Sequence, residues 1–294
     1  MTQKILVVGD VMTDIIVVPE GPIVRGSDRR ATVRSRPGGS GANQAVWLGA
    51  MGAKVLFAAR VGAADKPMYQ NYFRGLGVVA ALGADRLLPS GVLVTIVDAD
   101  GERSFLTDRG ANLNLSADDL KQSLLEGVAL VMVSGYALFA PGPRAAVQAL
   151  CAVAKARGIA VAIDPASVGF LDEVGPANFL AWTQGADFLF ANESEAEALC
   201  GASGVEACLA ALGQSFGTVV IKRGAEGAVL GNRDGVALAL PALLVEAVDS
   251  TGAGDAFAAG FLAAHVAGED LATALGRGIA AGAKAVQSIG GQPS

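Results

Sequence analysis

Residues 249–257 read DSTGAGDAF, and this stretch decides how the rest of the chain is interpreted. From Gly254 onward the apolar residues recur at helical spacing, namely Phe257, Phe261, Leu262 and Val266. A helix therefore begins inside the motif. Its glycines would let an anion approach the unpaired amides at the positive end of that helix. The sequence predicts an anion cradle built on the backbone amides of residues 253–255.

Asp255 lies in the first turn of this expected helix. A carboxylate in that position is ordinarily a capping group. Beside an anion site it can instead take the proton of an attacking hydroxyl, while amides neutralise the charge on a transferred phosphoryl group. Ala253, Gly254 and Asp255 would supply those amides, with Gly252 in the turn before them. The motif favours a kinase, and capping is the alternative use of Asp255.

The composition is that of a globular protein with a substantial core. The chain has 294 residues, of which 52% are hydrophobic and 17% charged, enough for one large α/β domain or two small ones. A net charge of −6 argues against a nucleic-acid partner, because phosphate backbones bind clustered Lys and Arg. No apolar run is long enough for a signal peptide or a membrane span, so we expect a cytoplasmic protein with no membrane partner.

Several other kinds of site are disfavoured by what the chain contains. Cys151, Cys200 and Cys208 have no metal-ligand spacing, and an odd number fits reduced thiols better than disulfides. His265 has no second histidine for a zinc site or a Ser-His-Asp triad, so we expect a packed or capping side chain. Residues 37–45 (PGGSGANQA) lack the G-x-G-x-x-G order, and the chain has no GxxxxGK[ST] motif. Dinucleotide-binding and P-loop interpretations weaken accordingly.

Alternating strand and helix signals predict a parallel sheet. Buried strands are expected over 4–8, 54–61, 130–134, 159–164, 188–191 and 218–222, with helices over 143–157, 193–199 and 205–215. Such alternation gives right-handed βαβ units. Residues 15–36 and 92–107 suit strands exposed on one face, the second pair joined by an Asp100-Gly101 turn. The SADD sequence at 116–119 predicts the capped start of a helix.

Two acidic residues follow the first expected strand, Asp10 and Asp14. They stand at its carboxyl end, the edge at which open α/β sheets bind ligands. Capping of a turn is the structural alternative for Asp10. Asn192 and Glu195 have the spacing of a helix N-cap and its capping-box partner just beyond another strand.

The glycine-rich stretches 37–45 and 249–257 together resemble the two signatures of the ribokinase-like, or PfkB, carbohydrate kinases. The resemblance extends over nearly the whole chain. It implies a single domain over 1–294 with a three-layer α/β/α fold, in which a central, mostly parallel sheet carries a small β lid at about 15–36 and 92–107. Such a lid would exclude water from the bound sugar, and its outer face would form a homodimer contact.

The resemblance also implies roles for individual residues. Asp255 would be the general base. The residues implied for acceptor binding are Met12, Asp14, Gly38, Gly39, Asn43 and Arg109. Those implied for ATP are Asn192, Glu195, Lys222, Gly224, Gly227 and Gly254. Glu195 would organise Mg²⁺ through water, which fits an ion that keeps most of its hydration shell. The residues implied for a monovalent cation such as K⁺ are Asp249, Thr251, Ser288 and Gly290.

We therefore expect transfer of the γ-phosphoryl group of Mg-ATP to a hydroxyl of a small carbohydrate. Ser40 and the run Ser134-Gly135-Tyr136 differ from the lysine and glutamate of ribokinases proper, which argues against ribose itself. Arg109 is either a surface charge or a partner for a carboxylate, as in related keto-deoxysugar kinases. A nucleoside is a further acceptor within the family. From other classes, a sugar- or nucleotide-binding sensor and a nicotinamide dehydrogenase remain alternatives.

Overall fold

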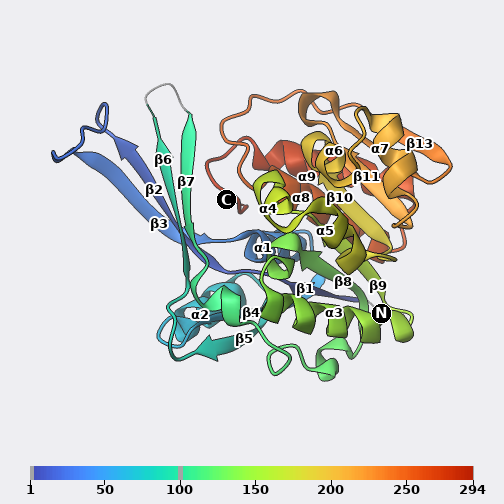
Figure 1. The fold of residues 1–294 in the computed structure, drawn as a ribbon, viewed down its shortest axis with the longest axis horizontal. Helices are drawn as coiled ribbons and strands as arrows, with labels where there is room; N and C mark the ends of the chain where they lie inside the picture. The colour runs from blue at the N-terminus through green and yellow to red at the C-terminus, as the bar shows by residue number, and fades with distance from the viewer. Residues whose placement is uncertain (1–2, 99–101, 294) are drawn as a thin grey trace.

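The computed structural model describes residues 3–98 and 102–293, which form a large and a small β-sheet with flanking helices (Figure 1). The large sheet has nine strands in the order β13-β12-β11-β10-β9-β8-β1-β4-β5. Their bounds are β1 Lys4–Val8, β4 Lys54–Gly62, β5 Val79–Asp85, β8 Val128–Ser134, β9 Ala160–Asp164, β10 Phe188–Asn192, β11 Thr218–Lys222, β12 Ala228–Asn232 and β13 Gly235–Leu240. Among the strands of residues 3–98 and 102–293, only the pairs β11–β12 and β12–β13 of this sheet are antiparallel. The predicted mostly parallel α/β fold is therefore confirmed.

Both faces of the large sheet are buried, as the continuous apolar strands predict. On β1, Ile5 and Val7 point into one hydrophobic cluster, whereas Leu6 and Val8 point into the other. All four side chains are fully buried. Successive side chains along the strand point to opposite faces of the sheet, so they contribute alternately to two separate hydrophobic cores.

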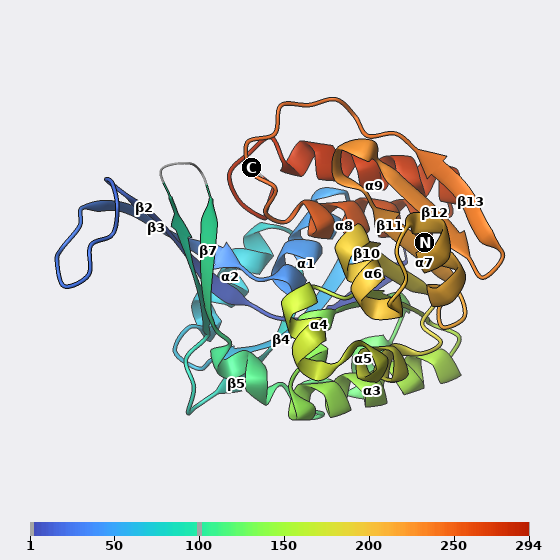
Figure 2. The same ribbon diagram turned by 45° about the horizontal axis from the view of Figure 1, so that its top comes forward.

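Helices cover these two faces as two layers (Figure 2). The helices of one layer are α1 Ser40–Ala50, α2 Lys66–Gly75, α8 Ala253–Val266 and α9 Leu271–Ala285. Those of the other are α3 Pro141–Ala156, α4 Val168–Val174, α5 Pro176–Thr183, α6 Glu193–Cys200 and α7 Val205–Leu212. Short 3-10 helices are η1 Gly110–Asn114, η2 Gln122–Leu125, η3 Gly135–Leu138 and η4 Gly224–Glu226. Within the described ranges, every helix is too short or too polar to cross a membrane.

The small sheet stands apart from the large one (Figure 2). It has the order β3-β2-β6-β7, with bounds β2 Met12–Pro19, β3 Ala31–Gly38, β6 Gly91–Val97 and β7 Arg103–Asp108. β2 runs antiparallel to β3 and parallel to β6, and β6 runs antiparallel to β7. The predicted Asp100-Gly101 turn lies outside the described residues. Val33, Phe105 and Leu106 of this sheet remain exposed.

A pair of glycines sets the height of α1 above the large sheet. A β-carbon on Gly41 would lie 2.6 Å from Cα of Gly9, closer than real β-carbons approach other atoms. The first turn of α1 consequently packs directly on the backbone that leaves β1. This close approach brings Ser40, Asn43 and Gln44 to the carboxyl edge of the sheet.

Candidate active site

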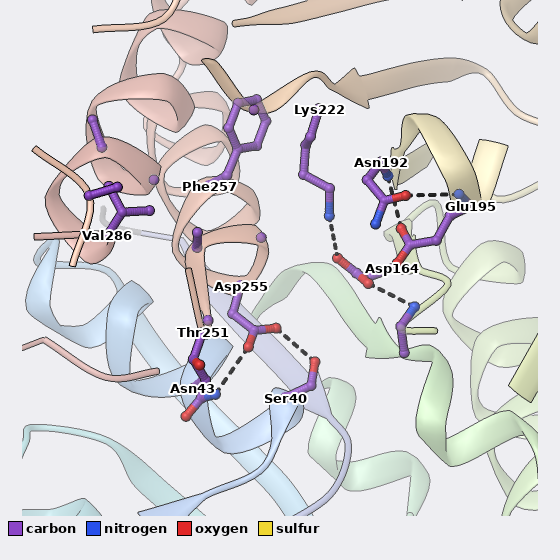
Figure 3. A pocket seen from close by; sticks show the side chains of 18 of the residues that line it. Ser40, Asn43, Asp164, Asn192, Glu195, Lys222, Thr251, Asp255, Phe257 and Val286 are labelled. Atoms are coloured by element: carbon purple, nitrogen blue, oxygen red, sulfur yellow. Dashed lines mark hydrogen bonds and ion pairs between the residues drawn. The ribbon is translucent and has the colours of Figure 1, made fainter. Parts of the chain in front are cut away.

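A cavity of about 690 Å³ opens at the carboxyl edge of the large sheet, with walls from both sheets and from α1 and α8. The predicted site residues that line it are Met12, Asp14, Gly39, Asn43, Arg109, Asn192, Glu195, Lys222, Gly224, Gly227, Thr251, Gly252, Ala253, Gly254 and Asp255. Four predicted residues are not among its lining residues, namely Gly38, Asp249, Ser288 and Gly290. Residues that the sequence spreads over more than 240 positions therefore line one cavity (Figure 3).

The carboxylate of Asp255 points from α8 toward α1 (Figure 3). Its Oδ1 accepts hydrogen bonds from Oγ of Ser40 at 2.7 Å and from Nε2 of Gln44 at 3.1 Å. Its Oδ2 accepts one from Nδ2 of Asn43 at 3.1 Å. Within the described residues, the side chain of Asp255 caps no amide of its own helix. The carboxylate lies in the first turn of α8, and the three donors just named all belong to α1.

The protonation of Asp255 is set by opposing effects. Burial raises the pKa of its carboxyl from 3.8 to about 7, and the negative charge of Asp164 adds to the rise. The hydrogen bonds from Ser40 and Asn43 and the charge of Lys222 act in the other direction. A group with a pKa near neutrality can both take and release a proton under ordinary conditions.

The helix α8 begins at Ala253, inside the glycine-rich motif, as the apolar spacing predicts. Gly252 adopts a left-handed conformation, with φ of 72°, and turns the chain into the helix. The amide of Ala253 donates to the carbonyl oxygen of Ser250 at 3.2 Å, so it is engaged within the turn. A β-carbon on Gly254 would lie 3.0 Å from Nζ of Lys222. The absent side chain at Gly254 thus leaves the ammonium group next to the helix start.

Lys222 belongs to a buried group of charges at the ends of three neighbouring strands (Figure 3). Its Nζ lies 3.0 Å from Oδ2 of Asp164. Burial alone would lower the pKa of Lys222, but the charges of Asp164 and Glu195 outweigh burial and raise it. Burial raises the pKa of Glu195, which Lys222 opposes. One buried cation is therefore shared between two carboxyl groups.

The predicted capping box at the start of α6 is confirmed. The amide of Glu195 donates to Oδ1 of Asn192, and the amide of Asn192 donates to Oε2 of Glu195, both at 2.8 Å. These reciprocal bonds hold the Glu195 carboxylate at the cavity wall. Within the described part of the chain, no cluster of three or more carboxyl, histidine or cysteine side chains is arranged to bind a metal ion directly.

Asp14 lies in β2 with 7% of its surface exposed. Burial raises the pKa of its carboxyl from 3.8 to about 7, although the charge of Arg36 lowers it. Within the described residues, its Oδ1 has no hydrogen-bond partner. A β-carbon on Gly38 would collide with this carboxylate. Gly38 therefore makes room for Asp14 from the neighbouring strand, although it does not line the cavity.

Asp10 holds the first turn of α1 in place. Its Oδ1 accepts from the amide of Gly41 at 3.1 Å and from Oγ of Ser134 at 3.3 Å. The capping alternative for Asp10 is therefore observed. Gly39 precedes α1 with φ of 94°, and a β-carbon there would lie 3.0 Å from the amide nitrogen of Met12. The loop before α1 and the start of β2 consequently lie against each other at the cavity.

Arg109 is fixed over Tyr136 at the cavity wall. Its guanidinium carbon lies 4.8 Å from the centre of the Tyr136 ring, and its Nη2 donates to the Tyr136 carbonyl oxygen at 3.1 Å. Within residues 3–98 and 102–293, no carboxylate forms an ion pair with Arg109. Burial raises the pKa of the Tyr136 hydroxyl. The arginine is thus an oriented positive charge beside the cavity.

The loop expected to hold a monovalent cation is tied to the C-terminal tail. Oδ1 of Asp249 accepts from the amide of Thr251 at 2.8 Å, and Oδ2 accepts from the amide of Gly290 at 2.9 Å. The amide of Ser288 donates to the carbonyl oxygen of Ala285 at 3.3 Å. Nη1 of Arg36, on β3, reaches the carbonyl oxygen of Ile289 at 2.7 Å. The structure brings Asp249, Thr251 and Gly290 together beside the cavity.

Sequence reasoning missed Asp164 and Gln44. Asp164 ends the buried strand β9, at the same edge as Asp10, and that position was the available signal. Gln44 lies one residue after Asn43 in the glycine-rich stretch, but a buried glutamine has no signature in a single sequence. His265 is packed as expected, with its ring 4.8 Å from that of Phe188.

Comparisons with known proteins identify the family and the fold of this chain. A family model described as pfkB family carbohydrate kinase matches residues 2–294. The chain is 33% identical over 297 residues to the bifunctional protein HldE of Pseudomonas aeruginosa PAO1, an alignment that covers 92% of this chain and 57% of that protein. The chain thus spans a little over half the length of this relative.

Solved structures of similar fold cover the whole chain. An adenosine kinase from Sinorhizobium meliloti has a TM-score of 0.89 at 23% identity, covering 100% of this chain and 96% of that one. An Escherichia coli protein assigned as a ribokinase II, solved with ATP and Mg²⁺, has a TM-score of 0.87 at 23% identity, covering 99% and 94%. At such identities these structures establish the shared fold.

Proposed function

This chain belongs to the pfkB family of carbohydrate kinases, and we propose that it transfers the γ-phosphoryl group of Mg-ATP to a primary hydroxyl of a small sugar or sugar-like acceptor. Membership in the family makes it a phosphotransferase that acts on hydroxyl groups. The observation that carries the finer proposal is the Asp255 carboxylate, held at the start of α8 with a pKa of about 7. It faces the same cavity as Asp14 and Lys222.

In this proposal Asp255 accepts the proton of the attacking hydroxyl. The amides of Gly254 and Asp255 stabilise charge on the transferring group, because the first amides of a helix lack partners within it. The amide of Ala253 would join them only after it leaves the Ser250 carbonyl oxygen, to which it now donates. Lys222 supplies positive charge next to Gly254.

Acceptor orientation falls to residues on the α1 side of the cavity. Oδ1 of Asp14 and Oδ1 of Asn43 are buried, and within the described residues neither has a hydrogen-bond partner. Both can accept hydrogen bonds from hydroxyl groups of an acceptor, which would repay the cost of burying them. The backbone at Gly39 lies beside them. A hydroxyl-rich ligand fits these acceptor atoms better than an apolar one.

The residues present also fit a nucleotide and its magnesium ion. Asp164 and Glu195 offer the hard oxygen atoms that Mg²⁺ prefers, directly or through water. When bound, Mg²⁺ would neutralise charge on the phosphate oxygens. The structural relative that contains ATP and Mg²⁺ supports this assignment. Asn192, Gly224 and Gly227 line the same part of the cavity.

We further propose that residues 1–294 act as one domain whose small sheet is a lid. Leu93 and Thr107 of that sheet line the cavity, so a shift of the sheet would change access of water. Its exposed apolar side chains, including Phe105 and Leu106, fit a homodimer contact. A monovalent cation such as K⁺ would bind at the loop formed by Asp249, Thr251, Ser288 and Gly290.

One observation favours a second candidate, in which the acceptor carries a carboxylate. Arg109 is oriented by Tyr136 and has no carboxylate partner in the described residues. A guanidinium held in this way can bind a carboxylate through two parallel hydrogen bonds. Arg109→Lys should then raise KM for a sugar acid by at least about tenfold and leave kcat within threefold. An unchanged KM would exclude this candidate.

The direct test measures ADP release from Mg-ATP across pentoses, hexoses, keto-deoxy acids and nucleosides, with and without K⁺. Stimulation by one class of acceptor is expected and would identify it. If no acceptor in the panel stimulates ADP release although ATP still binds, the proposed transfer is contradicted. That result would favour a binding protein without turnover.

A further inference from the structure

Three side chains on one face of α1 converge on Asp255. Ser40, Asn43 and Gln44 are related by three and four positions, which places them side by side on a helix. Nε2 of Gln44 donates both to Oδ1 of Asp255 and to Oγ of Ser40, each at 3.1 Å. Oγ of Ser40 in turn donates to the same Oδ1 at 2.7 Å (Figure 3). Ser40, Gln44 and Asp255 thus form a closed triangle of hydrogen bonds.

A glutamine at position 44 lowers the stability of the fold if its side chain does nothing but pack. Its side chain is completely buried, and within the described residues its Oε1 has no hydrogen-bond partner. A buried amide oxygen without a partner destabilises the fold, and an apolar side chain of similar volume would avoid that cost. The neighbours of Gln44 on α1, Ala42, Ala45 and Val46, are apolar and buried. The function of the Gln44 amide therefore lies in the bonds made by Nε2.

Those bonds make the two oxygens of Asp255 unequal. An ionised carboxylate has about two acceptor positions on each oxygen. On Oδ1 both are filled, by Ser40 and Gln44, whereas within the described residues Oδ2 has the single donor Asn43. A hydroxyl of an acceptor can therefore donate to Oδ2 without displacing a protein group. A half turn of the carboxylate only exchanges two equivalent oxygens, so the position beside Ser40 and Gln44 stays filled and the position beside Asn43 keeps room for one more donor.

We propose that Ser40 and Gln44 are positioning residues that occupy Oδ1 of Asp255, so that the proton of the acceptor hydroxyl passes to Oδ2. This inference rests on the proposed role of Asp255 as the base. In the step itself, the acceptor oxygen bonds to the γ-phosphorus as its O–H bond breaks, the proton goes to Oδ2, and ADP leaves with the electron pair of the broken P–O bond.

Electrostatics supports the same assignment. The hydrogen bond from Ser40 to Oδ1 stabilises the ionised form of Asp255 and so opposes the effect of burial on its pKa, and the bond from Asn43 to Oδ2 acts in the same direction. The other titratable groups that act on this carboxyl are Asp164 on β9, Lys222 on β11 and Tyr136 on η3. None of these is changed when Ser40 or Gln44 is replaced. A change in the titration of Asp255 in such variants would therefore report the lost donors.

The experiment compares Gln44→Met, Ser40→Ala, Ser40→Thr and the Ser40→Ala/Gln44→Met double variant. Methionine keeps the length of glutamine and removes both N–H donors, whereas threonine keeps the hydroxyl that alanine lacks. Gln148→Met is the matched control, because Gln148 on α3 donates to the Trp182 carbonyl oxygen outside this cavity. The pKa of Asp255 is measured by carbon-13 NMR of labelled aspartate, with Asp255→Asn to assign the signal. In parallel, kcat and KM are measured with the acceptor found in the panel.

We expect Gln44→Met and Ser40→Ala each to raise the pKa of Asp255 by about half a pH unit or more and to lower kcat about tenfold. KM for ATP should change less than twofold in both. The factor by which kcat falls in the double variant should be smaller than the product of the two single factors, because both side chains act on the same oxygen. Ser40→Thr should regain most of the titration and kcat that Ser40→Ala loses, because it keeps the hydroxyl. Gln148→Met should retain the titration and kcat of the wild type.

An unchanged pKa of Asp255 together with an unchanged kcat in folded Ser40→Ala would overturn the proposal, even if Gln44→Met fails to fold. The NMR arm needs no turnover. If Asp255→Asn keeps full activity, the proposed base is wrong, whereas the titration still decides whether Ser40 and Gln44 hold its carboxylate.

Discussion

Nζ of Lys222 lies 3.0 Å from Oδ2 of Asp164, where β11 and β9 end at the same edge of the large sheet. Glu195 shares this buried cation, which is why its charge and that of Asp164 together raise the pKa of Lys222 against the effect of burial. In the proposed reaction the same ammonium would face ATP phosphates at the start of α8. Its carboxylate partners therefore balance it when no phosphate is present.

Replacing Lys222 by Met should destabilise the fold. The change leaves Asp164 and Glu195 buried without their counter-charge, which costs about 3–5 kcal/mol in the free energy of unfolding. Urea denaturation at pH 8 measures it. Lys155→Met on the exposed side of α3 is the control and should stay within about 0.5 kcal/mol of the wild type. If Lys222→Met and the control have equal stability, the charge of Lys222 does not stabilise the buried carboxyl groups of Asp164 and Glu195.

The rate of the chemical step should depend on pH through Asp255. Its pKa of about 7 means that the fraction of ionised base rises tenfold per pH unit below neutrality and then levels off. Measured at a limiting concentration of acceptor, kcat/KM should follow this curve from pH 5 to pH 9, because kcat/KM reports the ionisation of the enzyme before the acceptor binds. A rate that is flat across pH 6 to 8 would contradict the assignment of Asp255 as a base that must be ionised.

Asp14→Asn should stabilise the folded protein at alkaline pH. The pKa of Asp14 is raised from 3.8 to about 7, so the folded state holds this proton more tightly than the unfolded state. Wild-type stability therefore falls as pH rises between these two values, and the penalty is fully present above pH 7. Asparagine removes the penalty of burying an ionised carboxyl. The free energy of unfolding should therefore rise by about 1–3 kcal/mol at pH 8, and this difference should disappear near pH 4. Thermal denaturation at both pH values checks the sign; a gain of equal size at pH 4 would rule this origin out.

Ala166→Gly should also be stabilising. Ala166 follows β9 at the cavity wall with φ of 75°, and its amide donates to Oδ1 of Asp164 at 2.9 Å. A left-handed conformation is about 1 kcal/mol less favourable for alanine than for glycine, because alanine has a β-carbon. We expect a gain of up to about 1 kcal/mol in chemical denaturation. The reverse change, Gly158→Ala at φ of 70° in open space, should lose a similar amount; a gain there would contradict the backbone argument.

Strong local signals account for what could be predicted from the sequence. The apolar run of β1 and the apolar spacing of α8 each depend on one element, and both were found where expected. α4 and α5, with 7 and 8 residues, were not predicted, and in the part of the chain that the structure describes neither begins with a side-chain cap such as the Asn192–Glu195 pair that marks the equally short α6. Such short segments show too little periodicity to distinguish them from loops.

The rest of the site depends on contacts between distant segments. The SADD sequence at 116–119 predicted a helix start, but no helix begins there in the described chain. Instead Asp119 accepts from Ser116 and from Arg60 of β4, 59 positions away. In the same way, the bonds from Ser40 and Gln44 to Asp255 span 215 and 211 positions. No spacing within one sequence encodes such pairs.

The most direct test of the account is acceptor-dependent ADP formation by Asp255→Asn beside the wild type, with ATP binding measured by calorimetry. Asparagine keeps the shape of the side chain and cannot take the hydroxyl proton. The account predicts that kcat falls by at least about a thousandfold while the Kd for ATP changes less than threefold. A variant that retains kcat within tenfold of the wild type would contradict the central claim that Asp255 is the catalytic base.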